Sequence, residues 1–250
     1  LATAVKVRVA PMRLLRSGMN CDEAYQLRQG VRRVAPDVGQ DNWLPIRKMM
    51  QYEYLAAVQY VNGFGMMGLE AHKHLMEGAA GVWSELGRLM GYDMLINNFD
   101  RLPLAWSNEG NLGNVMLGSE LGPVVGIDQC VSPITHPDGL ELYLGRVRAS
   151  IHEACDAPGP RFRAVQEAIY CNTGITISSE QMDELRSGCL AFAHEAAALC
   201  RNRELDGVLD SVGRGVLDEF GDQAEAAANV QKASSMVAAV AAAFVGAVNA

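Results

Sequence analysis

The chain has 250 residues, of which 49% are hydrophobic and 20% are charged, and its formal net charge is −8. A chain of this length can bury a substantial core as one large domain or two small ones, and its composition is ordinary for a globular protein. The negative charge argues against nucleic acid as a default partner, because binding a phosphate backbone requires a basic face.

The six cysteines are scattered along the chain and include no Cys-x-x-Cys pair. This spacing indicates neither a zinc site nor a disulfide framework, so we expect reduced thiols and a cytoplasmic protein. The chain does not begin with Met and shows no signal-peptide pattern, and its first residues, Leu1 to Val5, already have a strand-like composition. We therefore expect an N-terminally truncated fragment of a longer protein.

The first segment alternates apolar and basic residues from Val5 to Val9, the period-two pattern of an exposed or edge strand. Pro11 ends this pattern, and the residues from Met12 to Leu15 resume an extended one. We expect extended structure on both sides of the proline.

A helix is predicted next, opened by a capping box over Asn20 to Glu23 and continuing to about Val34. Residues 36–45, bounded by two prolines, are predicted to be a loop. The segment from Gln59 to Gly65 has the pattern of a strand followed by a glycine-rich turn.

Two further helices are predicted between residues 69 and 96. The first covers Leu69 to Gly78, and its His72 and His74 are two positions apart, so they do not share a helix face. We interpret them as surface histidines rather than metal ligands. The second helix has apolar residues at the spacing of one buried stripe, namely Val82, Leu86, Leu89, Met90 and Met94.

The stretch from Leu95 to Ile134 organises the chain. The second helix gives way to a loop at Asn97 to Arg101, and Asn108, Asn111 and Asn114 follow among glycines. Two apolar runs, 115–117 and 124–127, flank a turn and predict a β-hairpin that ends at Asp128. Helix, loop and hairpin would thus present two carboxylates and an amide from the ends of regular elements.

The remainder is predicted to be helical after a turn-rich loop over Ser132 to Gly139. One helix covers Arg161 to Tyr170, and Ser178 with Gln181 caps another. A third helix is predicted from Leu205 to Phe220. The helix capped by Ser178 and this third helix each carry an apolar stripe that is expected to be core: Leu185, Cys189, Phe192 and Leu199 on the former, and Val208, Leu209, Val212, Val216 and Leu217 on the latter.

The alanine-rich end, Met236 to Ala250, has 15 residues, whereas a spanning helix needs about 20. We expect a terminal helix that packs on the domain and no membrane partner, with a membrane anchor as the alternative.

Phosphoryl transfer uses one carboxylate to orient a hydroxyl, and an Asn and an Asp to hold magnesium on a nucleotide. Asp100 is the candidate base, although an Asp at this junction could equally pair with Arg101 or cap a turn. Asn114 and Asp128 are the candidate magnesium ligands, since magnesium prefers oxygen. For Asn108 and Asn111 we favour turn chemistry, because Asn tolerates left-handed conformations beside glycine.

These motifs carry a family resemblance. The runs are N-F-D-R-L-P-L-x-W at Asn98 to Trp106, N-x-G-N-L-G-N at Asn108 to Asn114, and V-V-x-I-D at Val124 to Asp128. Together they resemble the actin-fragmin kinase catalytic domain, an atypical member of the protein-kinase-like superfamily. The resemblance extends over about residues 5–200 and is strongest over 82–134.

The resemblance implies an α+β, protein-kinase-like fold with a partial N-terminal lobe and hinge (residues 1–62) and a mainly helical C-terminal lobe (residues 63–250), the catalytic loop and hairpin lying at 95–134. It implies ATP- and Mg2+-dependent phosphorylation of a protein Ser or Thr. Actin in complex with a severing protein is the substrate that the family suggests.

In this family comparison, Asp100 corresponds to the catalytic base, and Asn114 and Asp128 correspond to the Mg2+ ligands. The backbone of the hinge residues Tyr60, Val61 and Asn62 would pair with the adenine of ATP.

The chain also departs from the kinase pattern. Asp100 and Asn114 are 14 positions apart, whereas the usual loop H-R-D-x-x-x-x-N has four residues between them. The insertion 102–113 must therefore loop out, and no Phe-Gly follows Asp128. No G-x-G-x-x-G precedes residue 60, and Ala4 to Val7 is only a weak match to the strand-lysine motif.

The missing glycine loop leaves an alternative function open, a non-catalytic kinase-like fragment or pseudokinase that acts as an interaction module. A lipid kinase is less favoured, because no cluster of Lys and Arg lies near the site to hold a phosphoinositide head group.

Overall fold

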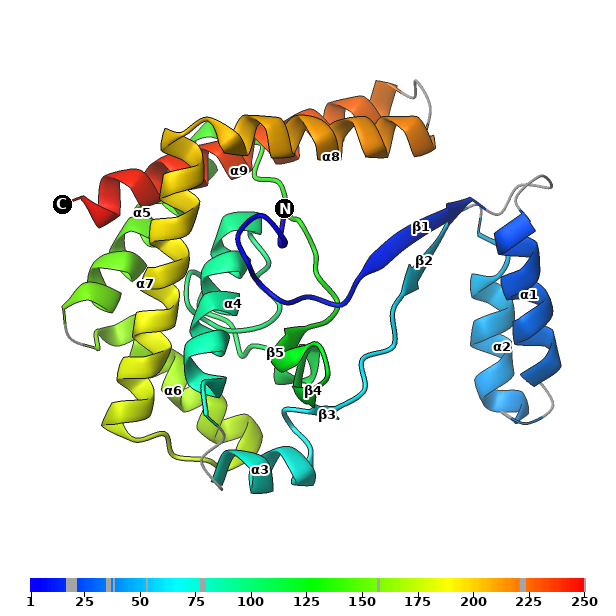
Figure 1. Ribbon diagram of the computed structural model, residues 1–250, viewed down its shortest axis with the longest axis horizontal. Coiled ribbons are helices and arrows are strands. Elements are labelled where there is room, and N and C mark those ends of the chain that lie inside the picture. The colour runs from blue at the N-terminus through cyan, green and yellow to red at the C-terminus, as the bar shows by residue number, and fades with distance from the viewer. Residues whose placement is uncertain are drawn as a thin grey trace. The chain divides into compact units, whose positions relative to one another are not determined.

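The computed structural model describes residues 1–16, 22–34, 37, 39–52, 54–76, 80–156, 158–220 and 224–249. They form two compact units, one of Ala10–Tyr60 and one of Leu1–Val9 with Val61–Ala250 (Figure 1). The assignment of residues 1–62 and 63–250 to two kinase lobes stays a prediction.

The smaller unit contains a two-stranded sheet and two helices. Strand β1 (Met12–Arg16) pairs antiparallel with β2 (Tyr54–Val58). Helix α1 (Asp22–Val34) ends where the sequence predicted, and α2 (Gln40–Met49) follows it. The predicted capping residue Asn20 lies outside the described residues. The extended pattern after Pro11 is thus confirmed as a strand.

Helix α2 corrects the prediction of a loop over 36–45. It begins at Gln40 and contains Pro45, which has no N–H for the helical hydrogen-bond ladder. An interior proline usually costs a helix about 3 kcal/mol or more, which is why the sequence favoured a loop. Here the bonds on either side are kept, with Trp43 N donating to Gly39 O at 3.0 Å and Met50 N to Ile46 O at 3.0 Å.

The larger unit is built around helix α4 (Val82–Ile96), which lies alongside α7 (Ser179–Arg201) in Figure 1. The predicted apolar stripe of α4 is confirmed, since all five of its residues are buried. Trp83 and Tyr92, outside the stripe, are buried as well. The helix is therefore covered on most of its surface, and its C-terminal end has a fixed position in the core.

Two glycines set the close approach of α4 and α7. A Cβ on Gly87 would lie 1.9 Å from the carbonyl oxygen of Leu185, and one on Gly188 would lie 1.9 Å from that of Ser84. Both obstacles are backbone atoms, so only glycine fits at either position.

A three-stranded antiparallel sheet lies beside α4, in the order β3-β4-β5. Strands β4 (Val115–Ser119) and β5 (Gly122–Gly126) form the predicted hairpin, and β3 (Phe64–Gly65) pairs with β4. The described chain is mostly helical with small sheets, which is compatible with the expected α+β class. Helix α3 (Leu69–Met76) follows β3, and its His74 ring packs on Phe64 at a centroid distance of 5.2 Å.

The predicted strand over Val5 to Val9 is wrong. The chain there forms turns, with Val7 N donating to Ala2 O at 3.0 Å, and only Val9 makes an isolated bridge, parallel to Gly126. The alternation reflects burial instead, because Val5 and Val7 are buried while Lys6 and Arg8 are exposed. A period-two pattern shows which side chains face the core, but it does not show that the backbone is in a strand. In this segment local turns provide backbone hydrogen bonds that a neighbouring strand would otherwise have provided.

Helices α5 (Pro137–Cys155), α6 (Pro160–Thr173), α8 (Glu204–Phe220) and α9 (Ala224–Val248) complete the unit with α7. The capping box of α7 is confirmed by bonds in both directions between Ser178 and Gln181. Proline at the first position of α5 ends the predicted loop earlier than Gly139. The stripe of α8 is not full core, because its Val212 is 45% exposed and its other four members are half-buried.

Helix α9 has 25 residues, more than the 15 expected for the terminal segment. Its C-terminal half buries Met236, Val240 and Phe244, and the helix contacts α5, α7 and α8. Among the described helices it alone is long and apolar enough to cross a membrane, a property that core helices of soluble proteins share. The absence of a membrane partner stays a prediction.

Candidate active site

The end of α4 places Asp100 at the surface. Asn97 ends the helix in the left-handed conformation, with φ of 53°, which Asn tolerates better than most residues. Asn98 N donates to Asp93 O at 2.8 Å and turns the chain away from the helix axis. Asn97 and Asn98 are buried, whereas Asp100 is exposed. A carboxylate is thus held in solvent at the end of a rigid helix.

Asp100 and Asn114 meet in the structure. The Nδ2 of Asn114 donates to Oδ2 of Asp100 at 2.9 Å, and Asn111 Nδ2 reaches the same oxygen at 3.5 Å. Asn111 also caps the short 3-10 helix η2 (Leu112–Asn114), accepting from Gly113 N at 3.1 Å. The turn role expected for Asn111 is therefore present together with a contact to Asp100. The 14 positions between Asp100 and Asn114 do not separate them in space.

Asp128 is brought to the same end of the hairpin by the backbone. The carbonyl of Asn114 accepts from Ile127 N at 3.0 Å, and Asp128 comes next in the chain. Asp128 is exposed and has φ of 55°. A non-glycine residue held in this conformation costs about 1–3 kcal/mol, and such strain clusters at functional sites. Asp128, with its exposed carboxylate, is therefore the residue directly after Ile127, whose backbone N–H bonds Asn114.

The oxygen donors at this end suit magnesium. The bond to Asp100 uses the amide nitrogen of Asn114 and leaves its Oδ1 as a possible ligand. Together with the Asp128 carboxylate this gives the oxygen set that magnesium prefers, with the remaining positions filled by water and phosphate oxygens. No group of three or more His, Cys, Asp or Glu residues in the described part of the chain could hold a metal. The assignment of Asn114 and Asp128 as ligands stays a prediction.

Arg101 does not pair with Asp100, the alternative that the sequence left open. Its fully buried guanidinium binds Asp93 through Nη1, Asn114 O through Nε at 3.2 Å, and Ile127 O through Nη2 at 2.8 Å. The sequence suggested Arg101 only as a partner of Asp100 and did not single out Asp93. The available signal was an Asp on a helix whose neighbouring positions are almost all apolar, since a buried carboxylate requires a partner.

Burial shifts the titration of the groups around Asp93. It raises the pKa of Asp93 by more than the neighbouring Arg101 lowers it. Burial, and then the charge of Asp93, raises the pKa of Tyr92 to about 12. The same two causes raise the pKa of Tyr143. Both phenols therefore stay protonated at neutral pH and cannot act as the general base.

The insertion between Asp100 and Asn114 packs on α5. Trp106 stacks on Tyr143 at a centroid distance of 5.4 Å, and its indole nitrogen donates to Asn97 Oδ1 at 2.7 Å. The guanidinium of Arg146 lies 4.6 Å from the Trp106 ring. Asn108 donates to the carbonyl of Phe99, nine positions earlier, so its bond crosses the loop and differs from the local turn role that the sequence suggested. The loop is therefore held by specific contacts, a property that its length alone did not predict.

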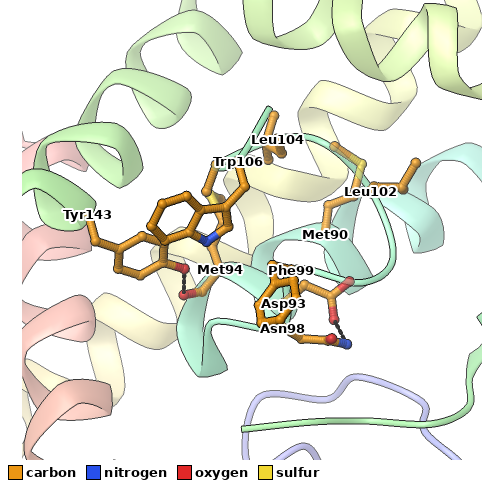
Figure 2. Close-up of a pocket in the computed structure, with 10 residues that line it drawn as sticks. Met90, Asp93, Met94, Asn98, Phe99, Leu102, Leu104, Trp106 and Tyr143 are labelled. Carbon is orange, nitrogen blue, oxygen red and sulfur yellow. Dashed lines mark hydrogen bonds between the residues drawn. The ribbon is translucent and has the colours of Figure 1, made fainter. Parts of the chain in front are cut away.

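Two hollows adjoin this loop. The smaller one, drawn in Figure 2, lies between Trp106, Tyr143, Met94 and the Asp93–Asn98 pair, and its volume of about 10 Å³ can hold no more than one water molecule. The larger one, of about 890 Å³, runs between residues 103–110 and helices α5 and α6. Only the second is large enough for a substrate.

The predicted hinge residues differ in exposure. Tyr60 is 84% exposed and ends the smaller unit, whereas Val61 begins the larger unit and is buried. Asn62 is exposed. Their contacts with adenine stay a prediction.

A carboxylate at a helix end, an amide bonded to it, and a second carboxylate at the end of a hairpin are the residue types that kinases bring together. Residues 1–122 match the family model of the actin-fragmin kinase catalytic domain. The family resemblance drawn from the sequence is therefore confirmed over this segment, although the matched range is shorter than the 5–200 expected. It includes Asp100 and Asn114, and Asp128 lies beyond it. No curated protein matches the chain.

Proposed function

We propose that this chain transfers the γ-phosphoryl group of MgATP to a Ser or Thr hydroxyl of a protein. The observation that carries the proposal is the bond between Asn114 Nδ2 and Asp100 Oδ2 at 2.9 Å, with Asp128 following the residue bonded to Asn114. The match of residues 1–122 to a family of protein kinases supports the same reaction class.

Asp100 would act as the base in this reaction. Its Oδ2 is occupied by Asn114 and Asn111, which leaves Oδ1 to accept a hydrogen bond from the attacking hydroxyl. The hydroxyl oxygen forms a bond to the γ-phosphorus, the bond from that phosphorus to the β–γ bridging oxygen breaks, and the hydroxyl proton passes to Asp100. When bound between Asn114 and Asp128, magnesium would offset the negative charge of the phosphates.

The remaining features of the proposal come from the family. The backbone of Tyr60, Val61 and Asn62 would bind the adenine, and the acceptor would be actin in complex with a severing protein, in the cytoplasm. Actin is itself acidic, and the net charge of −8 on this chain does not favour binding of an acidic protein. The acceptor is therefore sought in a panel of proteins that includes actin.

A second candidate function is a kinase-like interaction module without activity. The observation in its favour is the sequence before residue 60, which has no G-x-G-x-x-G to cover the phosphates of ATP. A module of this kind would bind a protein partner but would not turn over nucleotide.

Nucleotide binding separates the two candidates. We expect MgATP to raise the melting temperature of the wild-type chain, because a ligand that binds only the folded state stabilises it by RT ln(1 + [L]/Kd). Asp128→Ala should abolish the magnesium-dependent part of the shift, and Asp218→Ala, at an exposed position of α8, should preserve it. No shift in the wild type would support the interaction module.

Transfer is tested on the same proteins with radiolabelled ATP and a panel of acceptors that begins with actin. Asp100→Asn should keep the thermal shift and lose the labelling of the acceptor, because it removes the base and leaves the proposed magnesium ligands in place. Labelling that persists in Asp100→Asn would rule out Asp100 as the base.

A further inference from the structure

We propose that Arg101, held in place by Asp93, is a positioning residue that fixes the relative places of Asp100, Asn114 and Asp128. The inference rests on the proposed function for the roles of those three residues. The positioning itself rests on the contacts of Arg101.

The guanidinium of Arg101 joins three elements. Nη1 binds Asp93 on α4, Nε donates to Asn114 O at the end of η2, and Nη2 donates to Ile127 O beyond the end of β5. One of these acceptors belongs to Asn114, a candidate magnesium ligand. Another belongs to Ile127, the residue before the second candidate ligand, Asp128. Because the donors of a guanidinium lie in one rigid plane, three simultaneous bonds fix three segments relative to one another.

The backbone of Arg101 is fixed as well. Its carbonyl accepts from Asn111 N at 3.0 Å, and Asn111 in turn reaches Asp100. A Cβ on Gly110 would lie 2.9 Å from this carbonyl oxygen, and one on Gly126 would lie 3.2 Å from Nη2. Because neither glycine has a side chain, both positions leave space for Arg101. The residue that follows the candidate base thus reaches each segment of the site.

Stability alone does not account for this pair. Arg101 is 0% exposed and Asp93 is 6% exposed, and no group among the residues that the structure describes forms a hydrogen bond with the buried second carboxylate oxygen of Asp93, Oδ2. Removing two charges from water costs more than their attraction commonly returns, so a buried ion pair is weak support for a fold. A pair with an unsatisfied carboxylate oxygen supports the fold still less. The positioning role of Arg101, in contrast, requires only the three hydrogen bonds that its guanidinium makes.

Lysine distinguishes positioning from charge balance. An ammonium at residue 101 would keep a positive charge near Asp93, but a single nitrogen cannot span three acceptors as a guanidinium does. The matched control is Arg186 on α7, which is 8% exposed and donates to Asp183 Oδ1 at 2.9 Å and to Asp156 O at 2.5 Å, two acceptors that are not residues of the site. Arg101→Lys and Arg186→Lys therefore make the same chemical change in two buried places.

The test compares the wild type, Arg101→Lys, Arg186→Lys and the double variant Asp93→Asn with Arg101→Met. The measurements are kcat and KM for MgATP at several magnesium concentrations, and amide hydrogen exchange at Ile127, whose N–H bonds Asn114 O. We expect Arg101→Lys to lower kcat about 10- to 100-fold, as loss of residues that orient metal ligands does, and to require more magnesium. Ile127 exchange should quicken in Arg101→Lys and in the double variant but not in Arg186→Lys, while both lysine variants share any fall in melting temperature.

The double variant shows whether Arg101 only neutralises Asp93. It removes both charges together, so it should fold, yet it also lacks the bonds to Asn114 and Ile127 and should keep the defect in kcat. Wild-type kcat in the double variant, or in Arg101→Lys, would overturn the inference, as would an equal loss in Arg186→Lys. A wild type that binds no MgATP would instead overturn the proposed function, and Ile127 exchange would then decide the positioning role without nucleotide.

Discussion

Asn114 has two separable roles, one for its side chain and one for its backbone. Its Nδ2 holds Asp100 at 2.9 Å, and its backbone carbonyl ties η2 to Arg101 and Ile127. Substitution of the side chain affects only the first of these, together with the magnesium ligand that we propose at Oδ1. The backbone bonds should survive, so the site can be impaired while the fold is preserved.

We predict that Asn114→Ala lowers the affinity for MgATP and the rate of transfer by at least about 10-fold, as removal of a metal ligand or its support does. Unfolding free energy should fall by only about 1 kcal/mol, the usual net value of one hydrogen bond. Isothermal titration with MgATP and urea unfolding measure the two effects. Asn202→Ala breaks a comparable amide-to-carboxylate bond, to Glu204, away from the site, and should leave nucleotide affinity unchanged.

The α4–α7 pair gives the site its rigid base, because Asp93 and the turn at Asn97 both belong to the C-terminal end of α4. The close approach of the two helices depends on Gly87 and Gly188, where added Cβ atoms would meet backbone oxygens at 1.9 Å. Any substitution there must move a whole helix, since backbone cannot rotate away as a side chain can.

Gly87→Ala should therefore destabilise the protein by about 1–3 kcal/mol, the usual cost of overpacking, even though alanine is the better helix former. Gly145→Ala on α5 is the matched control, because nothing lies within 4 Å of its Cβ position. That variant should gain about 0.5–1 kcal/mol. Urea denaturation of both measures the difference, and equal stabilities would mean that α4 and α7 are not in close contact.

Taken as one molecule, the chain shows which features its sequence determines locally. The α4 stripe, the α7 capping box and the β4–β5 hairpin were predictable because each depends on residues a few positions apart. Asp100 and Asn114 could be named from their motifs. The bond between them could not, because it depends on how Trp106 and Tyr143 dock the insertion on α5.

The two errors at the N-terminus of the chain have different causes. Residues 5–9 alternate because Val5 and Val7 enter the core of the larger unit, where local turns satisfy the backbone. Helix α2 tolerates Pro45 because neighbouring bonds are kept. The pairing of Arg101 with Asp93 was not predicted, because a sequence does not show that residues eight positions apart share one buried ion pair.

Alkaline pH should destabilise the whole molecule through its buried acids. Burial, with a smaller contribution from Cys155, raises the pKa of the Cys189 thiol to about 12, and burial raises the pKa of Tyr92 to about 12 as well. In the unfolded chain these groups ionise near about 8.5 and about 10. The unfolded state therefore loses protons first, so the free energy of unfolding falls as pH rises from about 8.5 towards 12.

Between pH 9 and 10 the thiol dominates this loss, and the slope should be about 1.4 kcal/mol per pH unit for a single group. Cys189→Ala removes it and should flatten the pH dependence of urea unfolding in that interval, whereas Cys171→Ala, at an exposed position on α6, should not. Alkylation should depend on exposure: Cys130 and Cys171, which are exposed, should react in the native state, and buried Cys189 should react only after unfolding. Equal slopes in the wild type and in Cys189→Ala would show that the thiol is not shielded from water in the folded molecule.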